Sequence, residues 1–148
     1  MFKVKILKKA AKSVLSQLNY LTSQLSLTAT APKPTSLSYL KKMLSQKDFY
    51  LLAIRSKGVI AASLIVYLTK IPTGIIAEVE DLIVDAPYRA WGLGRILIEK
   101  AIDIAQKKRA KHISLRTNPK RVDANKMYQS MGFMKVETNF YRINFPRK

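Results

Sequence analysis

Eight residues decide the fold of this chain: Tyr88-Arg-Ala-Trp-Gly-Leu-Gly-Arg95. The segment before them, 75–84, is rich in β-branched and aliphatic residues, as strands are. After them, apolar residues recur at helical spacing, at Leu93, Leu97, Ala101 and Ile104. A strand, a loop with two glycines and a helix start direct unpaired backbone N–H groups and the positive end of the helix dipole into the loop. The sequence therefore predicts an anion-binding loop at this point.

The spacing of this loop is Arg89-x-x-Gly92-x-Gly94. It is shorter than the dinucleotide-binding fingerprint and lacks the Lys-Ser/Thr pair of a P-loop. The side chain of Arg89 offers further donors to a phosphate. An ordinary strand-to-helix turn that uses glycine for its tight geometry would show the same spacing, so the interpretation depends on a second motif.

The rest of the chain alternates between strand-like and helix-like segments. Strands are predicted at 2–6, 49–54, 59–68, 75–84, 112–116, 133–136 and 141–145, and helices at 7–18, 37–46, 93–108 and 122–131. Short turns between consecutive strands favour a mostly antiparallel sheet with one parallel crossover around the loop. We expect an α/β (α+β) fold, in which a mixed sheet of six to seven strands is flanked by about four helices. At 148 residues, the chain is expected to form a single domain, 1–148.

The composition excludes several kinds of chemistry. The chain has no cysteine, which excludes disulfides, thiolate metal sites and a cysteine acyl-enzyme. Its single histidine, His112, begins a predicted strand and is expected to be structural, so no metal site is predicted. No apolar run approaches the roughly 18 residues of a membrane helix. The acid-free segment 1–47 lacks the central apolar stretch of a secretory signal, and we expect a cytoplasmic protein.

The net charge of +18 has two interpretations. It could serve a polyanionic partner, such as a phosphorylated cofactor, nucleic acid or the ribosome. It could equally reflect a lysine-rich proteome, because the lysines are scattered widely along the chain. Either way, non-specific nucleic-acid binding that weakens with salt is expected.

A second motif lies in the predicted helix at 122–131. Asn125 and Tyr128 are three residues apart and therefore share one helix face, and Met131-Gly-Phe133 follows them. Together with the glycine loop, this motif resembles the GNAT superfamily of acetyl-CoA-dependent N-acetyltransferases. Residues 81–95 look like that family's acetyl-CoA motif, and residues 124–133 look like its second cofactor motif. The resemblance is strong over residues 75–145 and weak before residue 48.

The resemblance implies the GNAT acyl-CoA N-acyltransferase fold and a division of labour among the residues. The coenzyme A pyrophosphate would bind to Arg89 and to the backbone N–H groups of Ala90, Trp91, Gly92, Leu93, Gly94 and Arg95. The pantetheine arm would pair as an extra strand with the backbone of Leu82, Ile83 and Val84. In the family, the N–H group at the position of Leu82 stabilises the developing oxyanion. Asn125 would touch the pantetheine or acetyl region, and Tyr128 would protonate the departing thiolate.

Two residues of the loop depart from the family pattern. Ala90 stands where glycine is frequent, and it fits that position if its φ angle is negative. Trp91 stands where a basic residue is usual, which costs a phosphate contact. Its ring either covers the cofactor or is simply an exposed aromatic side chain.

Four of the nine acidic residues fall within eight positions, at Glu78, Glu80, Asp81 and Asp85. Strand alternation puts Glu78 and Glu80 on one face and Asp81 on the other. An amine with a pKa of about 10.4 in water must lose a proton before it attacks, and a positioned carboxylate can take that proton. GNAT proteins often carry proton-accepting residues at the positions of Glu78 and Glu80. We expect Glu80 to be the base and Glu78 its water-relay partner, the alternative being that these acids pair with lysines on a solvated face.

The sequence thus favours an acetyl-CoA-dependent N-acetyltransferase that acts on a primary amine by direct attack in a ternary complex. The acceptor could be a small molecule, such as a polyamine, aminoglycoside or amino-acid derivative, or a protein amine. The alternative is a basic protein associated with nucleic acid or the ribosome, or a CoA-binding pseudoenzyme, that keeps the fold. Monomer and homodimer are both compatible with the sequence.

Overall fold

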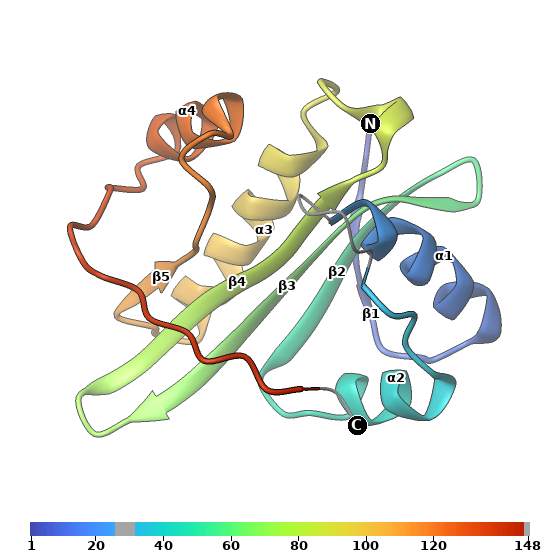
Figure 1. Cartoon of the computed structure of the whole chain (residues 1–148), viewed down its shortest axis with the longest axis horizontal. Coiled ribbons are helices and arrows are strands. Elements are labelled where there is room, and N and C mark those ends of the chain that lie inside the picture. Colours follow the sequence, from blue (N-terminus) through green and yellow to red (C-terminus); the bar gives the residue numbers. More distant parts are fainter. Residues whose placement is uncertain (26–31, 147–148) are drawn as a thin grey trace. The chain divides into compact units, whose positions relative to one another are not determined.

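Five strands form one mixed sheet in the order β1-β2-β3-β4-β5 (Figure 1). The fold is that of a computed structural model, which describes residues 1–25 and 32–146. The strands are β1 Val4–Leu7, β2 Phe49–Ser56, β3 Val59–Ile71, β4 Gly74–Val84 and β5 His112–Ser114. The first four pair antiparallel, and β5 lies parallel to β4. This sheet belongs to the first of two compact units, Met1–Arg116, and Thr117–Lys148 form the second.

The connections explain these strand directions. Lys57 and Gly58 both have positive φ angles, 48° and 83°, which is the geometry of a two-residue hairpin turn between β2 and β3. A second tight turn joins β3 to β4, and the 13-residue length of β3 matches the 11 residues of β4. The chain then crosses over through α3, which brings β5 in parallel to β4.

Helices cover both faces of the sheet. The helices α1 (Lys12–Thr22) and α2 (Leu37–Leu44) lie on one face, and α3 (Leu93–Lys107) lies on the other (Figure 1). Short 3₁₀ turns, η1 (Ser23–Leu25) and η2 (Ala86–Tyr88), follow α1 and β4. The second unit contains α4 (Val122–Ser130). In residues 1–25 and 32–146, no helix combines the length and the apolar content that crossing a membrane requires.

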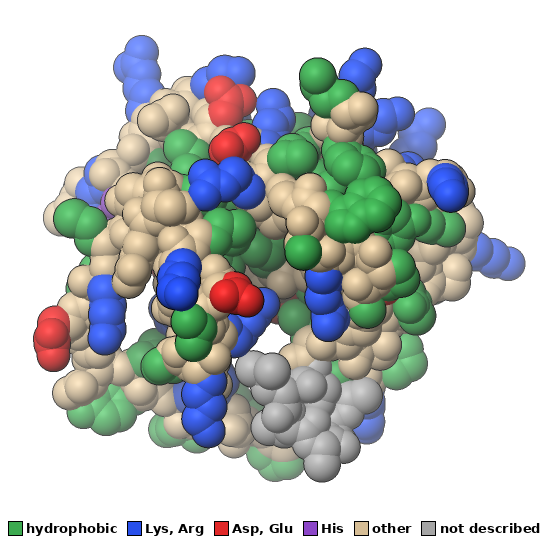
Figure 2. All heavy atoms as spheres, turned by 90° about the horizontal axis from the view of Figure 1, so that it is seen from above, with side chains coloured by type: hydrophobic (Ala, Val, Ile, Leu, Met, Phe, Trp, Pro, Cys, Tyr) green, Lys and Arg blue, Asp and Glu red, His purple; other side chains and the backbone are tan. Residues whose placement is uncertain are grey.

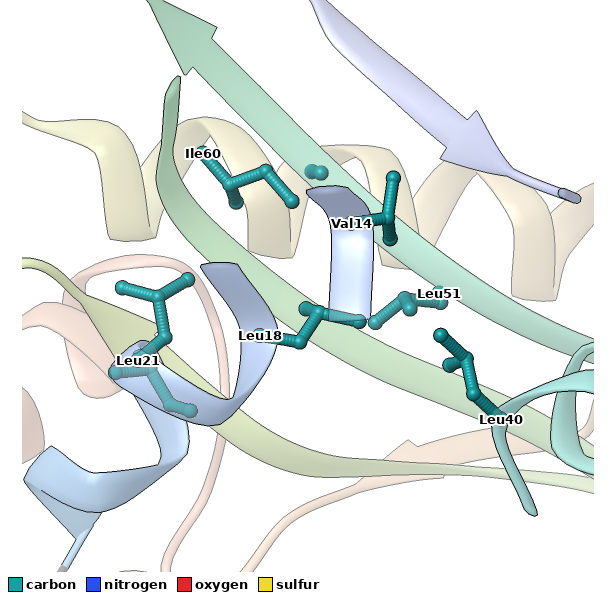
Figure 3. Close-up of a cluster of buried hydrophobic side chains, with 8 residues drawn as sticks. Val14, Leu18, Leu21, Leu40, Leu51 and Ile60 are labelled. Carbon is teal, nitrogen blue, oxygen red and sulfur yellow. The ribbon is translucent and has the colours of Figure 1, made fainter. Parts of the chain in front are cut away.

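The core on the α1–α2 face follows from the spacing of apolar residues in these helices. Val14, Leu18 and Leu21 of α1 recur every three or four residues and are buried. They meet buried side chains of α2, β2 and β3, namely Leu40, Leu51 and Ile60 (Figure 3). On the other face, the buried side of α3 is formed by Leu93, Leu97, Ile98, Ala101 and Ile104. The apolar spacing that predicts this helix is therefore its buried face.

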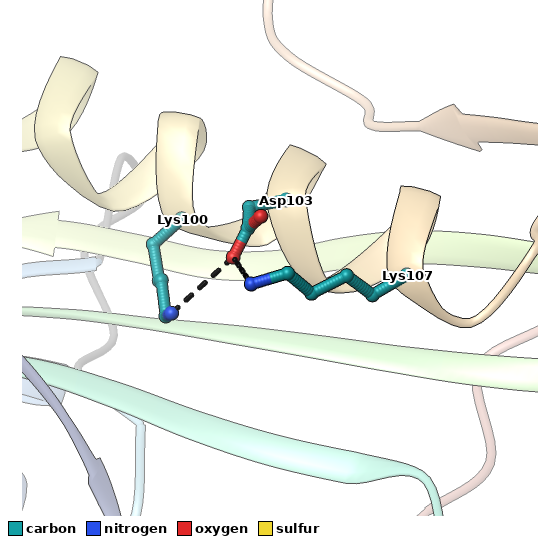
Figure 4. A network of polar contacts seen from close by, with 3 residues as sticks. All are labelled: Lys100, Asp103 and Lys107. Carbon is teal, nitrogen blue, oxygen red and sulfur yellow. Dashed lines mark hydrogen bonds and ion pairs between the residues drawn. The ribbon is translucent and has the colours of Figure 1, made fainter.

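The exposed side of α3 carries an ion-pair network. Asp103 Oδ2 lies 3.3 Å from Lys100 Nζ and 3.0 Å from Lys107 Nζ (Figure 4). The hydrogen bond from Lys107, together with that from Lys100, lowers the pKa of the Asp103 carboxyl below its ordinary value. Such exposed pairs contribute little to stability. Elsewhere, lysine and arginine side chains are spread over the visible face of the molecule rather than gathered in one patch (Figure 2).

The mixed α/β fold is confirmed, but the predicted number of strands is too high. Residues 133–136 and 141–145 were expected to form the last two strands, and the structure forms neither. Most of their apolar side chains are exposed, from 73% for Val136 to 87% for Met134, and Phe133 is half-buried. An alternating apolar pattern predicts a segment that suits a sheet, but a strand also requires a neighbouring edge to pair with, and the pattern does not supply one.

Candidate active site

A β-bulge interrupts β4 beside the predicted oxyanion donor. Ile83 is opposite Ser63 of β3, but Glu80 is opposite Ile65, so β4 contains one more residue than β3 over this stretch. Asp81 takes up the irregularity with a φ angle of 49°, in the left-handed region. A bulge leaves backbone groups out of the regular ladder and bends its strand. The backbone at Asp81 and Leu82 is therefore the irregular point of the strand.

One edge of β4 extends well past its neighbour. The parallel pairing with β5 covers only Ile76 to Glu78, whereas β4 continues to Val84. Within the described strands, no strand pairs with Asp81 to Val84 on the β5 side of β4. The resemblance to the GNAT family places the pantetheine arm on this edge, at Leu82, Ile83 and Val84.

The loop after β4 ends in a helix start without a side-chain cap. Gly92 is the N-cap of α3, with a left-handed φ angle of 80°, and the first intrahelical bond runs from Ile96 N to Gly92 O at 3.2 Å. The N–H groups of Leu93, Gly94 and Arg95 precede that bond and have no acceptor within the helix. A Cβ atom added at Gly92 would meet nothing within 4 Å, so glycine is required here for its backbone angle and not for space.

Ala90 corrects one expectation. The sequence argument required a negative φ angle at this residue, but the structure gives 66°. An L-residue in the left-handed region is strained by roughly 1–2 kcal/mol. The loop thus keeps the backbone conformation that suits glycine, although the residue is alanine.

Arg89 braces the loop through protein contacts. Its Nε donates to Val84 O and its Nη2 to Gln24 Oε1, both at 3.2 Å. The amide of Gln24 also donates to Asp85 Oδ1 at 2.9 Å, and Tyr20 Oη donates to the same oxygen at 3.2 Å. That hydrogen bond raises the pKa of Tyr20 above its ordinary value.

This network ties the end of α1 and η1 to the turn that follows β4. Asp85 is buried at its centre, and the backbone N–H of Ala86 also donates to Gln24 Oε1, at 3.3 Å. Gln24 belongs to no motif, and nothing in its sequence neighbourhood marks it as part of the site.

The two glutamates share one face of the sheet, as alternation predicts. Tyr67 lies opposite Glu78 in the β3–β4 register and donates to Glu78 Oε2 at 2.6 Å. Burial and that hydrogen bond raise the pKa of Tyr67 to about 12. Arg116 Nη1 lies 4.0 Å from Glu78 Oε2 and 3.7 Å from Glu80 Oε1. Arg116 is thus a salt-bridge partner of both acids.

Glu78, Glu80, Tyr67 and Arg116 form a carboxylate cluster. It brings two carboxylates and one guanidinium together on a chain whose net charge is +18. Tyr67 and Arg116 were not predicted. Tyr67 is recognised from the β3–β4 register, which places it opposite Glu78, and Arg116 is recognised from its distances to the two glutamates.

Comparison with known proteins identifies the family of this chain. Residues 18–133 match the model of the Acetyltransferase (GNAT) family. The chain belongs to this family. No protein among the curated sequences matches the chain.

Solved structures of GNAT proteins resemble the chain over nearly its whole length. A ribosomal-protein-alanine N-acetyltransferase from Brucella melitensis biovar Abortus 2308 is 19% identical, with 99% of each chain covered and a TM-score of 0.82. An aminoglycoside acetyltransferase from an uncultured soil metagenomic sample, in complex with trehalose, is 22% identical, with 97% of each chain covered and a TM-score of 0.77. AAC(6')-Iy, in complex with a bisubstrate analogue, CoA-S-monomethyl-acetylneamine, is 17% identical, with 98% of this chain and 99% of that chain covered and a TM-score of 0.76. At these identities the likeness shows the GNAT fold.

The remaining predicted residues of the GNAT site lie in the second unit. Asn125 Nδ2 donates to Asn118 O at 3.0 Å and to Arg121 O at 2.8 Å, which fixes the start of α4. Tyr128 is buried, and its ring packs edge-on against Phe133 at 5.9 Å. Burial raises the pKa of the Tyr128 phenol, so the group carries its proton at neutral pH. Within residues 1–25 and 32–146, no three His, Asp or Glu side chains are grouped so that they could hold a metal ion.

Proposed function

We propose that this GNAT protein is an acetyl-CoA-dependent N-acetyltransferase that acetylates a primary amine by direct attack in a ternary complex. The observation that carries the proposal is the loop 89–95, in which the left-handed Gly92 precedes a helix start without a side-chain cap. Backbone N–H groups and the positive helix end suit a diphosphate. The donors present therefore fit the pyrophosphate of coenzyme A.

The bulged strand supports the placement of the pantetheine arm. An extended amide-containing arm can bind a free strand edge through main-chain hydrogen bonds. The edge of β4 from Val79 to Val84 lies beyond its pairing with β5 and leads directly to the loop. Leu82, Ile83 and Val84 are the residues that we assign to this contact.

The chemistry then falls to a few groups. Bound acetyl-CoA supplies the acetyl group as a thioester. The N–H of Leu82 at the bulge donates to the carbonyl oxygen and stabilises the charge that develops there. Glu80 accepts the proton of the acceptor amine, with Glu78 relaying it through water. Tyr128, protonated at neutral pH, donates to the departing sulfur, and Asn125 lines the same arm.

The contacts of the two carboxylates favour Glu80 as the base. Tyr67 occupies Oε2 of Glu78 with a hydrogen bond of 2.6 Å, and the side chain of Glu78 is 23% exposed. The side chain of Glu80 is 47% exposed and can meet an acceptor that arrives from solvent. An acceptor can therefore reach Glu80 more readily than Glu78.

The acceptor that fits this surface is a cationic amine. Glu78 and Glu80 place two partly exposed carboxylates on a strongly basic chain, and carboxylates attract a cation and repel an anion. Two of the structural neighbours are described as acting on aminoglycosides and on ribosomal-protein alanine, so small-molecule and protein amines both belong in a substrate panel.

The experiment that tests the loop uses a pair of variants at Gly92. Gly92→Asn and Gly92→Asp have similar size, and both residues tolerate a left-handed backbone, but only Asp adds a negative charge. A like charge about 4 Å from a phosphate costs about 4 kcal/mol near a protein surface, so Gly92→Asp should weaken acetyl-CoA binding by more than about a hundredfold. Gly92→Asn should retain most of the affinity. Equal calorimetric affinities for the two variants would remove the loop from the cofactor site.

A second measurement addresses the basic surface. Within the first 47 residues there are nine lysines and no acid, so a nucleic-acid-binding role is the competing function. Binding that rests on phosphate contacts with nucleic acid weakens steeply with salt. We expect acetyl-CoA affinity to change much less between about 50 and 200 mM salt than RNA affinity, together with thiol release when a cationic amine is added. Tight RNA binding without thiol release from any amine would favour the competing function.

A further inference from the structure

The side chain of Trp91 projects from the cofactor loop as a supported aromatic surface. It is 59% exposed, although tryptophan is among the most hydrophobic side chains. Its ring nevertheless has a defined orientation, because Tyr88 packs edge-on against it at 5.6 Å and Phe2 lies at 6.1 Å with an interplanar angle of 53°. Figure 2 shows hydrophobic side chains gathered on the upper surface between lysine and arginine side chains.

Two elements far apart in the sequence build this support. Phe2 precedes β1, and Tyr88 ends η2 immediately before the loop. Edge-to-face packing fixes one ring while leaving a face of another open. An aromatic side chain held in this way loses little conformational freedom when a flat ligand stacks on it.

The position of Trp91 relates this surface to the diphosphate. Trp91 directly precedes Gly92, the N-cap residue whose helix offers its first N–H groups to the pyrophosphate. In coenzyme A, the adenine base is joined to that diphosphate through a single ribose. A base attached to a diphosphate at this helix start therefore lies within reach of the adjacent ring.

We propose that Trp91, supported by Tyr88 and Phe2, is the stacking platform for the adenine base of coenzyme A. This inference rests on the proposed function and adds a subsite to it. At this position the family usually has a basic residue that contacts a phosphate. Trp91 instead stacks on the adenine base, and stacking does not depend on salt. Stacking of one base on an aromatic side chain corresponds to roughly a 5- to 150-fold effect on the dissociation constant.

Trp91 is the only tryptophan of the chain, so its fluorescence reports on this site alone. The titrants are inorganic pyrophosphate, ADP and acetyl-CoA, with binding measured in parallel by calorimetry. We expect ADP and acetyl-CoA to quench the emission, because their adenine covers the ring, and pyrophosphate to bind without comparable quenching. Bound ADP that leaves the emission unchanged would overturn the proposal.

Two variants separate the platform from the loop. Trp91→Leu removes the ring and should raise the dissociation constants of ADP and acetyl-CoA by roughly 5- to 150-fold, while that of pyrophosphate stays the same. Trp91→Phe keeps a smaller ring and should lie between Trp91→Leu and the wild type. Thermal unfolding checks that both variants are folded.

The outcomes separate a failure of the proposed adenine subsite from a failure of the proposed transferase function. If the wild type binds acetyl-CoA and Trp91→Leu binds it equally well, the adenine subsite is wrong and the transferase assignment stands. If Trp91→Leu weakens pyrophosphate as much as ADP, Trp91 shapes the loop and is not a platform. If the wild type binds neither pyrophosphate nor acetyl-CoA, both proposals fail.

Discussion

The left-handed backbone of Ala90 leads to a prediction with an unusual sign. Its φ angle of 66° places an L-residue where glycine is unstrained, at a cost of roughly 1–2 kcal/mol. Ala90→Gly removes that strain. It also gives the unfolded chain more freedom, which destabilises the fold by about 0.4–1 kcal/mol. Taking the middle of each range, about 1.5 less about 0.7, we expect a net stabilisation of about 0.8 kcal/mol.

A matched control lies four residues earlier in the same connection. Ala86 begins η2, whose 3₁₀ backbone has negative φ angles, and its side chain is also exposed. Ala86→Gly therefore gains freedom in the unfolded state without releasing strain, and should destabilise the protein by about 0.4–1 kcal/mol. The two substitutions are chemically identical but should have opposite signs.

Chemical denaturation with urea measures both differences, and thermal unfolding provides a second readout. For a chain of this size, about 0.8 kcal/mol corresponds to roughly 2–3 °C in Tm. An unchanged m value would show that the effect lies in stability and not in the compactness of the unfolded state. If Ala90→Gly destabilises as much as Ala86→Gly, the strain at Ala90 does not exist and the described loop conformation is wrong.

Three further predictions concern the acid, the acceptor surface and the core. Tyr128→Phe should lower kcat at least tenfold with little change in acetyl-CoA affinity, and a fully active variant would exclude this acid. Because burial raises the pKa of Tyr128 above its ordinary value, any alkaline loss of activity that the wild type shows and the variant lacks should occur above the ordinary titration range of tyrosine. Arg116→Gln removes a cation 3.7 Å from Glu80 and should lower KM for a cationic amine about 1.5- to 5-fold, whereas a raised KM would mean that Arg116 itself holds the acceptor. Leu97→Ala opens the fully buried side of α3 and should cost about 2–5 kcal/mol in urea denaturation, so a loss below about 1 kcal/mol would contradict the packing.

The sequence predicted the parts of the fold that depend on local chemistry. The hairpin at Lys57 and Gly58, the burial of Leu97 on α3 and the shared face of Glu78 and Glu80 all follow from turn residues or periodicity. The prediction of two carboxyl-terminal strands was wrong because such local signals do not show whether a strand edge is available for pairing. Residues 133–136 and 141–145 have a strand-like composition, but pairing depends on an edge elsewhere in the chain.

The site shows the same division. The left-handed Gly92 at the start of α3 was predictable because glycine spacing and a following helix determine the backbone locally. Gln24, Tyr67 and Arg116 were not, because each acquires its role from a residue distant in the sequence: Gln24 from Asp85, and the other two from the glutamates of β4. The φ angle of Ala90 was also inaccessible, since an alanine gives no local signal for a left-handed backbone.

The extra residue at the bulge in β4 reverses which side chains of the following residues, odd-numbered or even-numbered, lie on a given face of the sheet. Glu78 and Glu80 have even numbers and lie on the α1–α2 side of the sheet, opposite Tyr67 and Ile65, yet the odd-numbered Ile83 packs into the cluster on that same side. Without the irregularity at Asp81, a single strand could not present both carboxylates to an acceptor and an anchoring aliphatic side chain to the same helices. Deletion of the extra residue would shift one part of β4 by one position. Either Ile83 or the two glutamates would then point to the opposite face of the sheet, so the number of residues between them matters as much as their identity.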